Sequence, residues 1–371
     1  MGPTLYRLAS ERRYNSIIEH IQNHPEDVHW RDRYGSSVLH LMCQAPDVTE
    51  SLLEAVKAVL RASPSHLIIS QNRATCTPLH YAAGKRMIWG GGDDRGTELV
   101  LLLLKHGPEA VSVRTSSGSK AGRTPFHIAC EANADSRVLK AMLLINPRLA
   151  TEPYVKKDVY SVAAHPLQLL WNSRADANRR GPTSSTTSTT TSTTHEKMAL
   201  LLRAAHYGTV DDTFHQGSPV LLLHAACSVR CPQDYFLQLL EQHRDQISTR
   251  DERGLLPLHY AIEHASVESQ PYTQFVVESL LQAYPQAASV PNIEGRLPLH
   301  VALMDSKLTW HKGGIQEIVF AFPEALRIPD PINGLPPFLA SAYHAIKSML
   351  HLSTTFELLR TAPELMEDIA R

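Results

Sequence analysis

One short motif recurs along the whole sequence at an interval near 40 residues. Six copies place a histidine in a similar apolar context, as in TPLHYAA, TPFHIAC and LPLHYAI, and these residues are His40, His80, His127, His224, His259 and His300. Two further copies carry Gln168 and Leu339 at that position. Self-similarity at a fixed period is typical of repeat folds, in which each unit contacts only its neighbours. We therefore expect one helical solenoid instead of the two to three globular domains that ~150 residues per domain would suggest.

The residues ahead of the histidine predict a tight turn. A glycine stands five positions before it in five copies: Gly35, Gly122, Gly254, Gly295 and Gly334. Four copies carry an Asp or Asn eight positions before the histidine, which is three positions before the glycine where a glycine is present. These residues are Asp32, Asn72, Asp251 and Asn292. Asp and Asn side chains bond to nearby backbone, and glycine accepts a positive φ, so each copy should open with a turn.

Each turn should lead into a pair of helices. In Thr77-Pro78 and Thr124-Pro125, a threonine suits the N-cap and a proline suits the first helical position. The apolar residues that follow recur at i, i+3 and i+4, with a small residue at the middle position, which predicts one buried face and a close helix contact. Aliphatic second helices are expected within residues 98–108, 137–147, 274–285 and 354–363, each of which ends at or just before a proline.

These features resemble the ankyrin repeat family. Its consensus, D-x-x-G-x-T-P-L-H-x-A-A, is closely approached by NRATCTPLHYAA, RDERGLLPLHYAI and PNIEGRLPLHVAL, and the resemblance extends over residues 4 to about 366. It implies an all-α solenoid of antiparallel helix pairs with short turn or hairpin tips on one side. The copies depart from the family in being longer than its usual ~33 residues and in lacking the Gly-His that follows the first helix.

The alignment divides the chain into four segments. Residues 1–29 match only the later part of a unit and carry several charges, so we expect a capping element. Residues 30–171 form a first repeat block, residues 172–195 a disordered inter-helix loop, and residues 196–371 a second block with a C-terminal cap. The loop contains TSSTTSTTTSTT at 183–194, which has no apolar surface to bury. It is either a neutral insertion, which we favour, or a phosphorylation platform preceded by Arg179 and Arg180.

Composition excludes several classes of protein. Lys+Arg 36 against Asp+Glu 37 leaves a net charge of -1, so there is no overall positive field for nucleic acid or an anionic membrane. No apolar run is long enough to span a bilayer. The five cysteines form no C-x-x-C pair, which favours a reducing compartment. We expect a soluble monomer of the cytoplasm, with the nucleus as an alternative.

Catalytic and metal-binding readings are weaker than structural ones. A residue that performs chemistry has no reason to recur in every repeat, so the six histidines should instead bond turn backbone and tie neighbouring units together. His224, Cys227 and Cys231 have the spacing of one helical face, but a fourth zinc ligand, such as His215, is not fixed by the sequence. Gly90-Gly91-Gly92 lacks the strand and the Gly-Lys-Ser/Thr of a phosphate loop. We expect no enzyme, no metal and no cofactor.

The expected function is a protein interaction scaffold. In ankyrin proteins, partners usually contact the two variable turn residues and exposed positions after the buried face of the first helix. Where the motif matches, the resemblance implies turn residues and helix residues as follows: Arg33, Tyr34, Arg73, Glu252, Arg253, Ile293 and Glu294 on turns, and Lys85, Glu131 and Glu263 on helices. The alternatives are a substrate-recruiting adaptor of a multi-subunit enzyme such as a ubiquitin ligase, a zinc-dependent enzyme, and a purely structural spacer.

Overall fold

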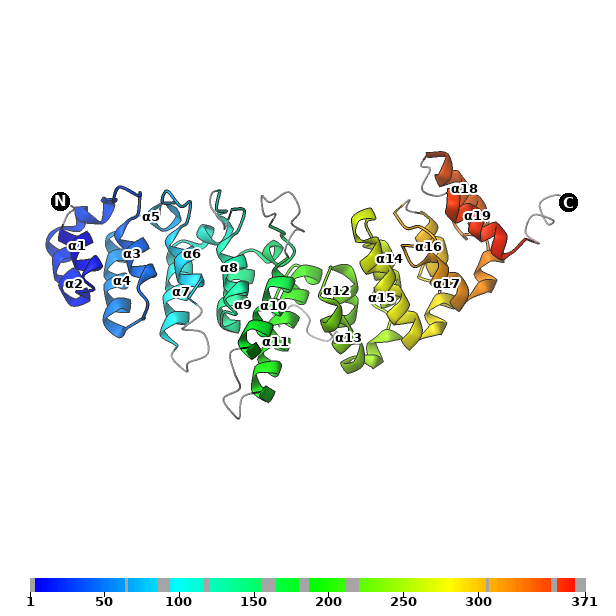
Figure 1. Ribbon diagram of the computed structural model, residues 1–371, viewed down its shortest axis with the longest axis horizontal. Helices are drawn as coiled ribbons and strands as arrows, with labels where there is room; N and C mark the ends of the chain where they lie inside the picture. Colours follow the sequence, from blue (N-terminus) through cyan, green and yellow to red (C-terminus); the bar gives the residue numbers. More distant parts are fainter. Residues whose placement is uncertain are drawn as a thin grey trace. The chain divides into compact units, whose positions relative to one another are not determined.

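The chain folds into stacked pairs of α-helices that form two compact units. The computed structural model describes residues 4–63, 66–85, 94–116, 121–154, 165–179, 187–210, 220–304, 307–347 and 352–363. Unit 1 comprises Met1–Gln216 and unit 2 comprises Gly217–Arg371 (Figure 1). The described residues form helices and turns without a β-strand. The chain therefore has the all-α repeat fold that the sequence predicts.

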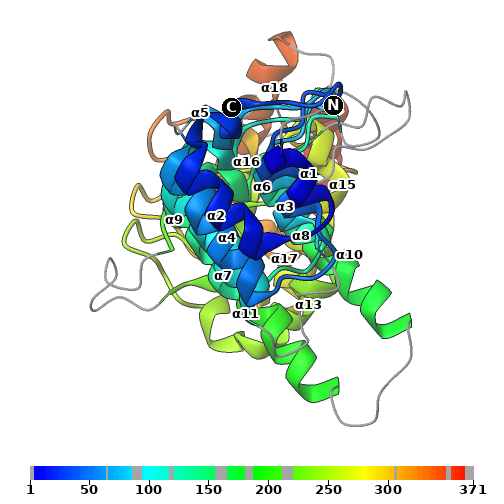
Figure 2. The same ribbon diagram turned by 90° about the vertical axis from the view of Figure 1, so that its left-hand side faces the viewer.

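The described residues of unit 1 form five helix pairs. Their bounds are α1 (Thr4–Ser10) with α2 (Tyr14–Asn23), α3 (Val38–Gln44) with α4 (Glu50–Ala62), α6 (Pro78–Ala83) with α7 (Arg95–His106), α8 (Pro125–Glu131) with α9 (Ser136–Ile145), and α10 (Pro166–Arg179) with α11 (Thr187–Tyr207). A short helix, α5 (His66–Ile69), precedes the second turn. Figure 2 shows α1, α3, α6 and α8 as one layer of this unit and α2, α4 and α7 as a second layer.

Unit 2 contains four helix pairs within its described residues. Their bounds are α12 (Leu222–Ser228) with α13 (Gln233–Gln242), α14 (Pro257–Glu263) with α15 (Gln270–Ala283), α16 (Pro298–Met304) with α17 (Ile315–Ala321), and α18 (Pro337–Lys347) with α19 (Leu352–Thr361). First helices contact first helices of the next pair, as α14 contacts α12 and α16. This stacking is the nearest-neighbour packing of a repeat protein.

Prolines set the ends of many helices, as the sequence predicts. Pro78 and Pro125 occupy the first positions of α6 and α8, after N-cap residues Thr77 and Thr124. The second helices are followed by proline-initiated 3₁₀ turns, such as η2 (Pro108–Ser112), η4 (Pro147–Ala150) and η8 (Pro285–Ser289). Proline has no N–H to continue a helix but tolerates the first position of a new turn. These 3₁₀ turns thus separate one helix pair from the next.

In five copies the repeated histidine bonds through Nε2 to a backbone carbonyl farther along the chain, and the exception is His259. His127 accepts a hydrogen bond at Nδ1 from the N–H of Thr124, at 3.2 Å, and its Nε2 donates to the carbonyl of Glu152, at 2.8 Å. His300 uses the same two atoms toward Leu297 and Ile328, at 3.2 and 2.8 Å. An imidazole that accepts at Nδ1 carries its proton on Nε2. His127 and His300 thus make both of the backbone contacts that the structural interpretation of this column predicts.

The core is built from the columns that the alignment identifies. The small residues Ala82, Ala129, Ala226, Ala261 and Ala302 are all buried. Cys43, Cys130 and Cys227 are buried in the position that Ala83, Ile262 and Leu303 hold elsewhere, and all five cysteines are free thiols. Small side chains at these positions allow the backbones of adjacent first helices to approach closely. The cysteines act there as small apolar residues.

The segment 172–195 differs from the predicted loop at both ends. Helix α10 continues to Arg179, and α11 begins at Thr187, inside the Ser/Thr run. Residues 180–186, with Arg180, lie outside the described residues. The boundary between the compact units falls after Gln216, later than the predicted break. The reason is that α11 packs against α9, where it buries Met198, Leu201 and Leu202, and that Lys197 Nζ donates to the Asn133 carbonyl at 3.2 Å.

None of the described helices is both long enough and apolar enough to cross a bilayer.

Candidate interaction surface

The turns before α3, α6, α14 and α16 are each held by one Asp or Asn side chain. Asp251 Oδ1 accepts from the N–H groups of Arg253 and Leu255, at 3.0 and 2.7 Å. Asn292 Oδ1 makes the same two bonds to Glu294 and Arg296, each at 3.0 Å. The five turn glycines have φ between 68° and 82°, the left-handed region that glycine accepts without strain. The predicted turn chemistry is confirmed, and it fixes the backbone of each tip.

Consecutive tips lie against one another. In unit 1, the N–H of Arg73 donates to the carbonyl of Tyr34, at 2.8 Å. In unit 2, a Cβ placed on Gly254 would lie 2.5 Å from Cγ2 of Ile293, and one on Gly295 would lie 3.4 Å from Cγ of Pro331. Among the described residues, the tips joined by these contacts therefore form an edge in each unit, on which exposed side chains of successive repeats are neighbours.

The edge of unit 1 exposes arginine. Arg33 and Arg73 stand at the same position of adjacent turns, seven residues before His40 and His80, and both are exposed. The guanidinium of Arg33 lies 4.8 Å from the ring centre of Tyr34, which is itself 52% exposed. Asp32 does not neutralise them at the surface, because its Oδ2 accepts from Tyr6 Oη at 2.6 Å and its Oδ1 from the Tyr34 and Ser36 N–H groups.

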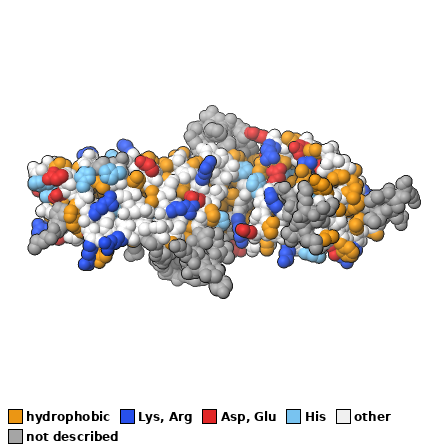
Figure 3. Space-filling model, turned by 90° about the horizontal axis from the view of Figure 1, so that it is seen from above, with side chains coloured by type: hydrophobic (Ala, Val, Ile, Leu, Met, Phe, Trp, Pro, Cys, Tyr) orange, Lys and Arg blue, Asp and Glu red, His pale blue; other side chains and the backbone are white. Residues whose placement is uncertain are grey.

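The edge of unit 2 is apolar and acidic at the equivalent position. Glu252 and Glu294 are exposed, and Ile293 is 72% exposed. Ile332, seven residues before Leu339, is 57% exposed. Figure 3, seen from the side on which α5 lies in Figure 1, shows hydrophobic side chains gathered over unit 2, with Lys and Arg side chains spread over both units.

The repeat alignment does not place Ile332 among the predicted turn residues. Its turn is one residue longer than the others, since Gly334 N–H bonds the carbonyl of Asp330, four residues back, whereas Gly254 bonds Asp251, three residues back. The aspartate was therefore out of register with the other copies. The signal that identifies Ile332 is the glycine column. Ile332 stands two residues before Gly334, as Ile293 stands two residues before Gly295.

Three of the predicted surface residues form a hydrogen bond or an ion pair with another residue of the protein. Lys85 is half-buried, and its Nζ donates to the carbonyl of Ala45, at 2.5 Å, in the preceding repeat. Burial lowers the pKa of Lys85. Glu131 pairs with the buried Arg123, and Glu263 lies 3.5 Å from the guanidinium of Arg253. These side chains have internal partners, so the turn residues are the more accessible members of the predicted set.

The zinc candidate residues have other contacts. His224 Nε2 donates to the carbonyl of Leu255, at 3.1 Å, and Cys231 Sγ lies 3.1 Å from Tyr272 Oη. Burial raises the pKa of Cys231 to about 12. His215 lies outside the described residues. Within those residues, no group of three or more His, Cys, Asp and Glu is arranged to hold a metal ion.

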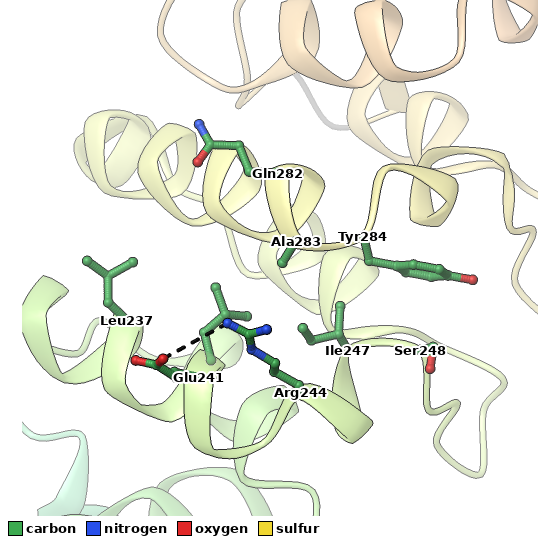
Figure 4. Close-up of a pocket in the computed structure, with 9 residues that line it drawn as sticks. Leu237, Glu241, Arg244, Ile247, Ser248, Gln282, Ala283 and Tyr284 are labelled. Carbon is green, nitrogen blue, oxygen red and sulfur yellow. Dashed lines mark ion pairs between the residues drawn. The ribbon is translucent and has the colours of Figure 1, made fainter.

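A groove lies between α13 and α15 in unit 2, away from the tips. It encloses about 620 Å³, and its apolar lining includes Leu237, Leu240, Ile247 and Ala283. Figure 4 shows Arg244 reaching toward Glu241 while Tyr284 extends away from both, and the closest N–O distance of the ion pair is 4.0 Å. Both charged side chains are largely exposed, so this pair contributes little to stability.

Comparison with known proteins adds one structural likeness. The crystal structure of the human ASB11 ankyrin repeat domain is similar at 14% sequence identity, with 86% of this chain and 97% of that chain covered and a TM-score of 0.26. No protein-family model and no curated protein matches the sequence. The class of fold rests on the helices themselves: this is an all-α repeat protein.

Proposed function

We propose that this chain is a non-catalytic scaffold that binds a protein partner through the turn edge of unit 2. The observation that carries the proposal is Ile293, an isoleucine 72% exposed at the tip of a turn whose backbone is fixed. Asn292 holds that turn through two N–H groups, and Gly254 leaves the space in which Cγ2 of Ile293 lies. A rigid apolar side chain loses little entropy on binding, and burying it fully is worth about 1.5 to 3 kcal/mol.

The neighbours of Ile293 suit a partner of mixed polarity. Ile332 extends the apolar surface along the edge, and Glu252, Arg253 and Glu294 surround it with charge. Protein interfaces commonly have an apolar centre and a polar rim. The arrangement therefore favours a protein over a small molecule as the ligand.

The repeated histidines support the non-catalytic part of the proposal. His40 and His127 use both ring nitrogens in backbone contacts of the stack. Burial lowers the pKa of both rings to about 4. A histidine engaged on both sides is not free to exchange protons with a substrate, so its recurrence reflects stacking.

A capture experiment tests the proposal. The full chain, immobilised, is expected to retain specific proteins from a cell extract, and the double variant Ile293→Asp/Ile332→Asp is expected to lose them. The matched control is Leu237→Asp/Val267→Asp, which places the same charges on exposed apolar residues of unit 2 that lie off the turns. With the purified partner, the tip variant should bind at least about tenfold more weakly. Equal binding by the tip variant and the wild-type chain would refute the proposal.

The adaptor alternative assigns the same surface to recruiting a substrate. Co-purification of ubiquitin ligase subunits with the full chain would distinguish it from a simple scaffold. No contact in the described part of the chain favours it over the scaffold.

A further inference from the structure

The turn edge of unit 1 presents two arginines whose neighbours leave their charge available. Arg33 and Arg73 occupy the same position of adjacent turns, and the bond from Arg73 N–H to the Tyr34 carbonyl, at 2.8 Å, holds these turns in register. No ion pair is recorded for either guanidinium among the described residues. Each of the two turns thus carries one arginine. The backbone of both turns is held in register, and both side chains are exposed.

The acidic group of the same turn points inward. Asp32 is engaged by Tyr6 Oη and by the N–H groups of Tyr34 and Ser36. Burial works against its ionised form, but these bonds prevail and lower the pKa of Asp32. It stays charged, yet its oxygens are occupied by the turn and by α1. The arginines therefore lack a carboxylate partner at the outer surface.

The third tip differs in its described arginine. Arg114 pairs with Glu152 and donates to the carbonyl of Gly122, at 3.2 Å. Its guanidinium is satisfied within the unit, unlike those of Arg33 and Arg73. Lys120, seven residues before His127, holds the equivalent position of this turn but lies outside the described residues. Among the described residues, the basic surface consists of Arg33 and Arg73, together with the exposed ring of Tyr34.

We propose that Arg33, Tyr34 and Arg73 bind an acidic segment of a partner protein. Arginine binds carboxylate through two parallel N–H bonds, and arginine and tyrosine are the side chains most often found at binding hot spots. Tyr34 supplies an apolar face between the cations, with Arg33 already above its ring. A nucleic acid is disfavoured because two cations on a chain of net charge -1 neutralise few phosphates.

This inference rests on the proposal that the chain is an interaction scaffold, and it names the chemistry of one part of the partner. It differs from the proposed contact at Ile293, because the equivalent positions of unit 2 are Glu252, Ile293 and Ile332. An acidic segment would be repelled by Glu252 and attracted by Arg33. The two edges therefore favour ligands of opposite charge. The experiment on one edge can fail while the experiment on the other succeeds.

A fluorescent glutamate-rich peptide provides the probe, with its glutamine counterpart as the uncharged reference. Anisotropy titrations should show binding of the glutamate peptide to the full chain, weakened by added salt. Arg33→Glu/Arg73→Glu should weaken binding at least about tenfold, a change of ~1.4 kcal/mol. Arg33→Lys/Arg73→Lys keeps the charge but loses the paired N–H bonds, so its affinity should lie between those of the wild-type chain and Arg33→Glu/Arg73→Glu.

The matched control is Lys105→Glu/Arg148→Glu, which makes the same change in net charge on exposed residues of unit 1 away from the tips. It should bind the peptide as the wild-type chain does, and circular dichroism should show every variant folded. Equal loss in this control, or no binding of the glutamate peptide, would overturn the inference. A single-stranded oligonucleotide that binds more tightly than the peptide and is lost in Arg33→Glu/Arg73→Glu would also overturn it, in favour of a general polyanion site.

Discussion

His40 donates from Nε2 to the backbone carbonyl of Cys76, at 3.0 Å, and so joins α3 to the start of the next repeat. Its Nδ1 accepts from the N–H of Ser37, at 3.1 Å. The ring is fully buried. One side chain thereby satisfies a helix N-terminus and an interrepeat carbonyl at once, which explains why the same residue recurs every ~40 residues.

Replacing His40 by alanine should destabilise unit 1 by on the order of 2 to 4 kcal/mol. The variant leaves a buried N–H and a buried carbonyl without partners and opens a cavity. Urea unfolding followed by circular dichroism measures the loss. His106→Ala, on the exposed end of α7, is the control and should change stability by less than ~0.5 kcal/mol. Similar effects of the two substitutions would contradict the role given to His40.

Stability should fall as the pH is lowered from about 6.5 to about 4. Burial lowers the pKa of His40, His127 and His259 to about 4, whereas the unfolded chain binds these protons near pH 6.5. The stabilisation by the neutral rings is therefore complete above pH 6.5 and is lost through this window, at ~1.4 kcal/mol per pKa unit for each ring.

Urea midpoints measured across this pH range check the histidine effect. The slope should be shallower in a His40→Asn variant, because asparagine does not titrate. An identical slope in wild type and variant would show that His40 does not contribute to the pH dependence.

Asp330→Asn should destabilise unit 2 by on the order of 3 kcal/mol. Arg296 Nε lies 3.0 Å from Asp330 Oδ1, and their side chains are only 11% and 4% exposed, so the variant leaves a buried charge unpaired. Adding Arg296→Leu should recover part of the loss, which a double-mutant cycle measures. Glu263→Gln, in the more exposed pair with Arg253, should cost less than ~1 kcal/mol. Additive losses at Arg296 and Asp330 would argue against the pair.

Gly254→Ala should destabilise more than Gly334→Ala. Both glycines have a left-handed φ, 68° and 69°, so alanine costs about 1 to 2 kcal/mol of backbone strain at either site. Only at Gly254 would the new Cβ also meet Ile293 Cγ2, at 2.5 Å, since nothing lies within 4 Å of it at Gly334. In an Ile293→Ala background, Gly254→Ala and Gly334→Ala should lower the free energy of unfolding by equal amounts. A difference that persists there would place the clash elsewhere.

The thiols of the native protein should react slowly with disulfide reagents. All five cysteines are buried, and burial raises the pKa of Cys43 and of Cys231 to about 12. Because the thiolate is the reactive form, modification should follow the rate of unfolding. The same reagent should titrate all five in urea. Rapid labelling of any of them in the native chain would contradict its burial.

Local chemistry accounts for what was predicted well. The Asp or Asn of each turn, Thr77 and Pro78 at a helix start, and the prolines after second helices act within a few residues, so the sequence pattern is sufficient to place them. The spacing of the six histidines, with Gln168 and Leu339 at the same position, then indicates where successive repeats begin. Each of these features depends on backbone geometry that neighbouring residues set.

The second turn shows where local chemistry was insufficient. Thr75 takes the place of the turn glycine and still adopts a φ of 56°, which is strained for a β-branched residue. Its Oγ1 accepts from the N–H of Ser116, at 2.8 Å, in the next tip. A contact 41 residues away thus stabilises a turn that its own residues disfavour.

The helix pairs, their turns and the recurring histidine can be predicted from the residues alone, because they follow from periodicity and from bonds between near neighbours. The stacked fold is needed to show that Lys85 reaches the Ala45 carbonyl, that Arg296 pairs with Asp330, and that α11 packs on α9 within unit 1. The physical reason is that each of these contacts joins different repeats, where loop lengths and side-chain directions set the partner. The same reason applies to the tips, whose exposed residues form an edge only once the repeats are stacked.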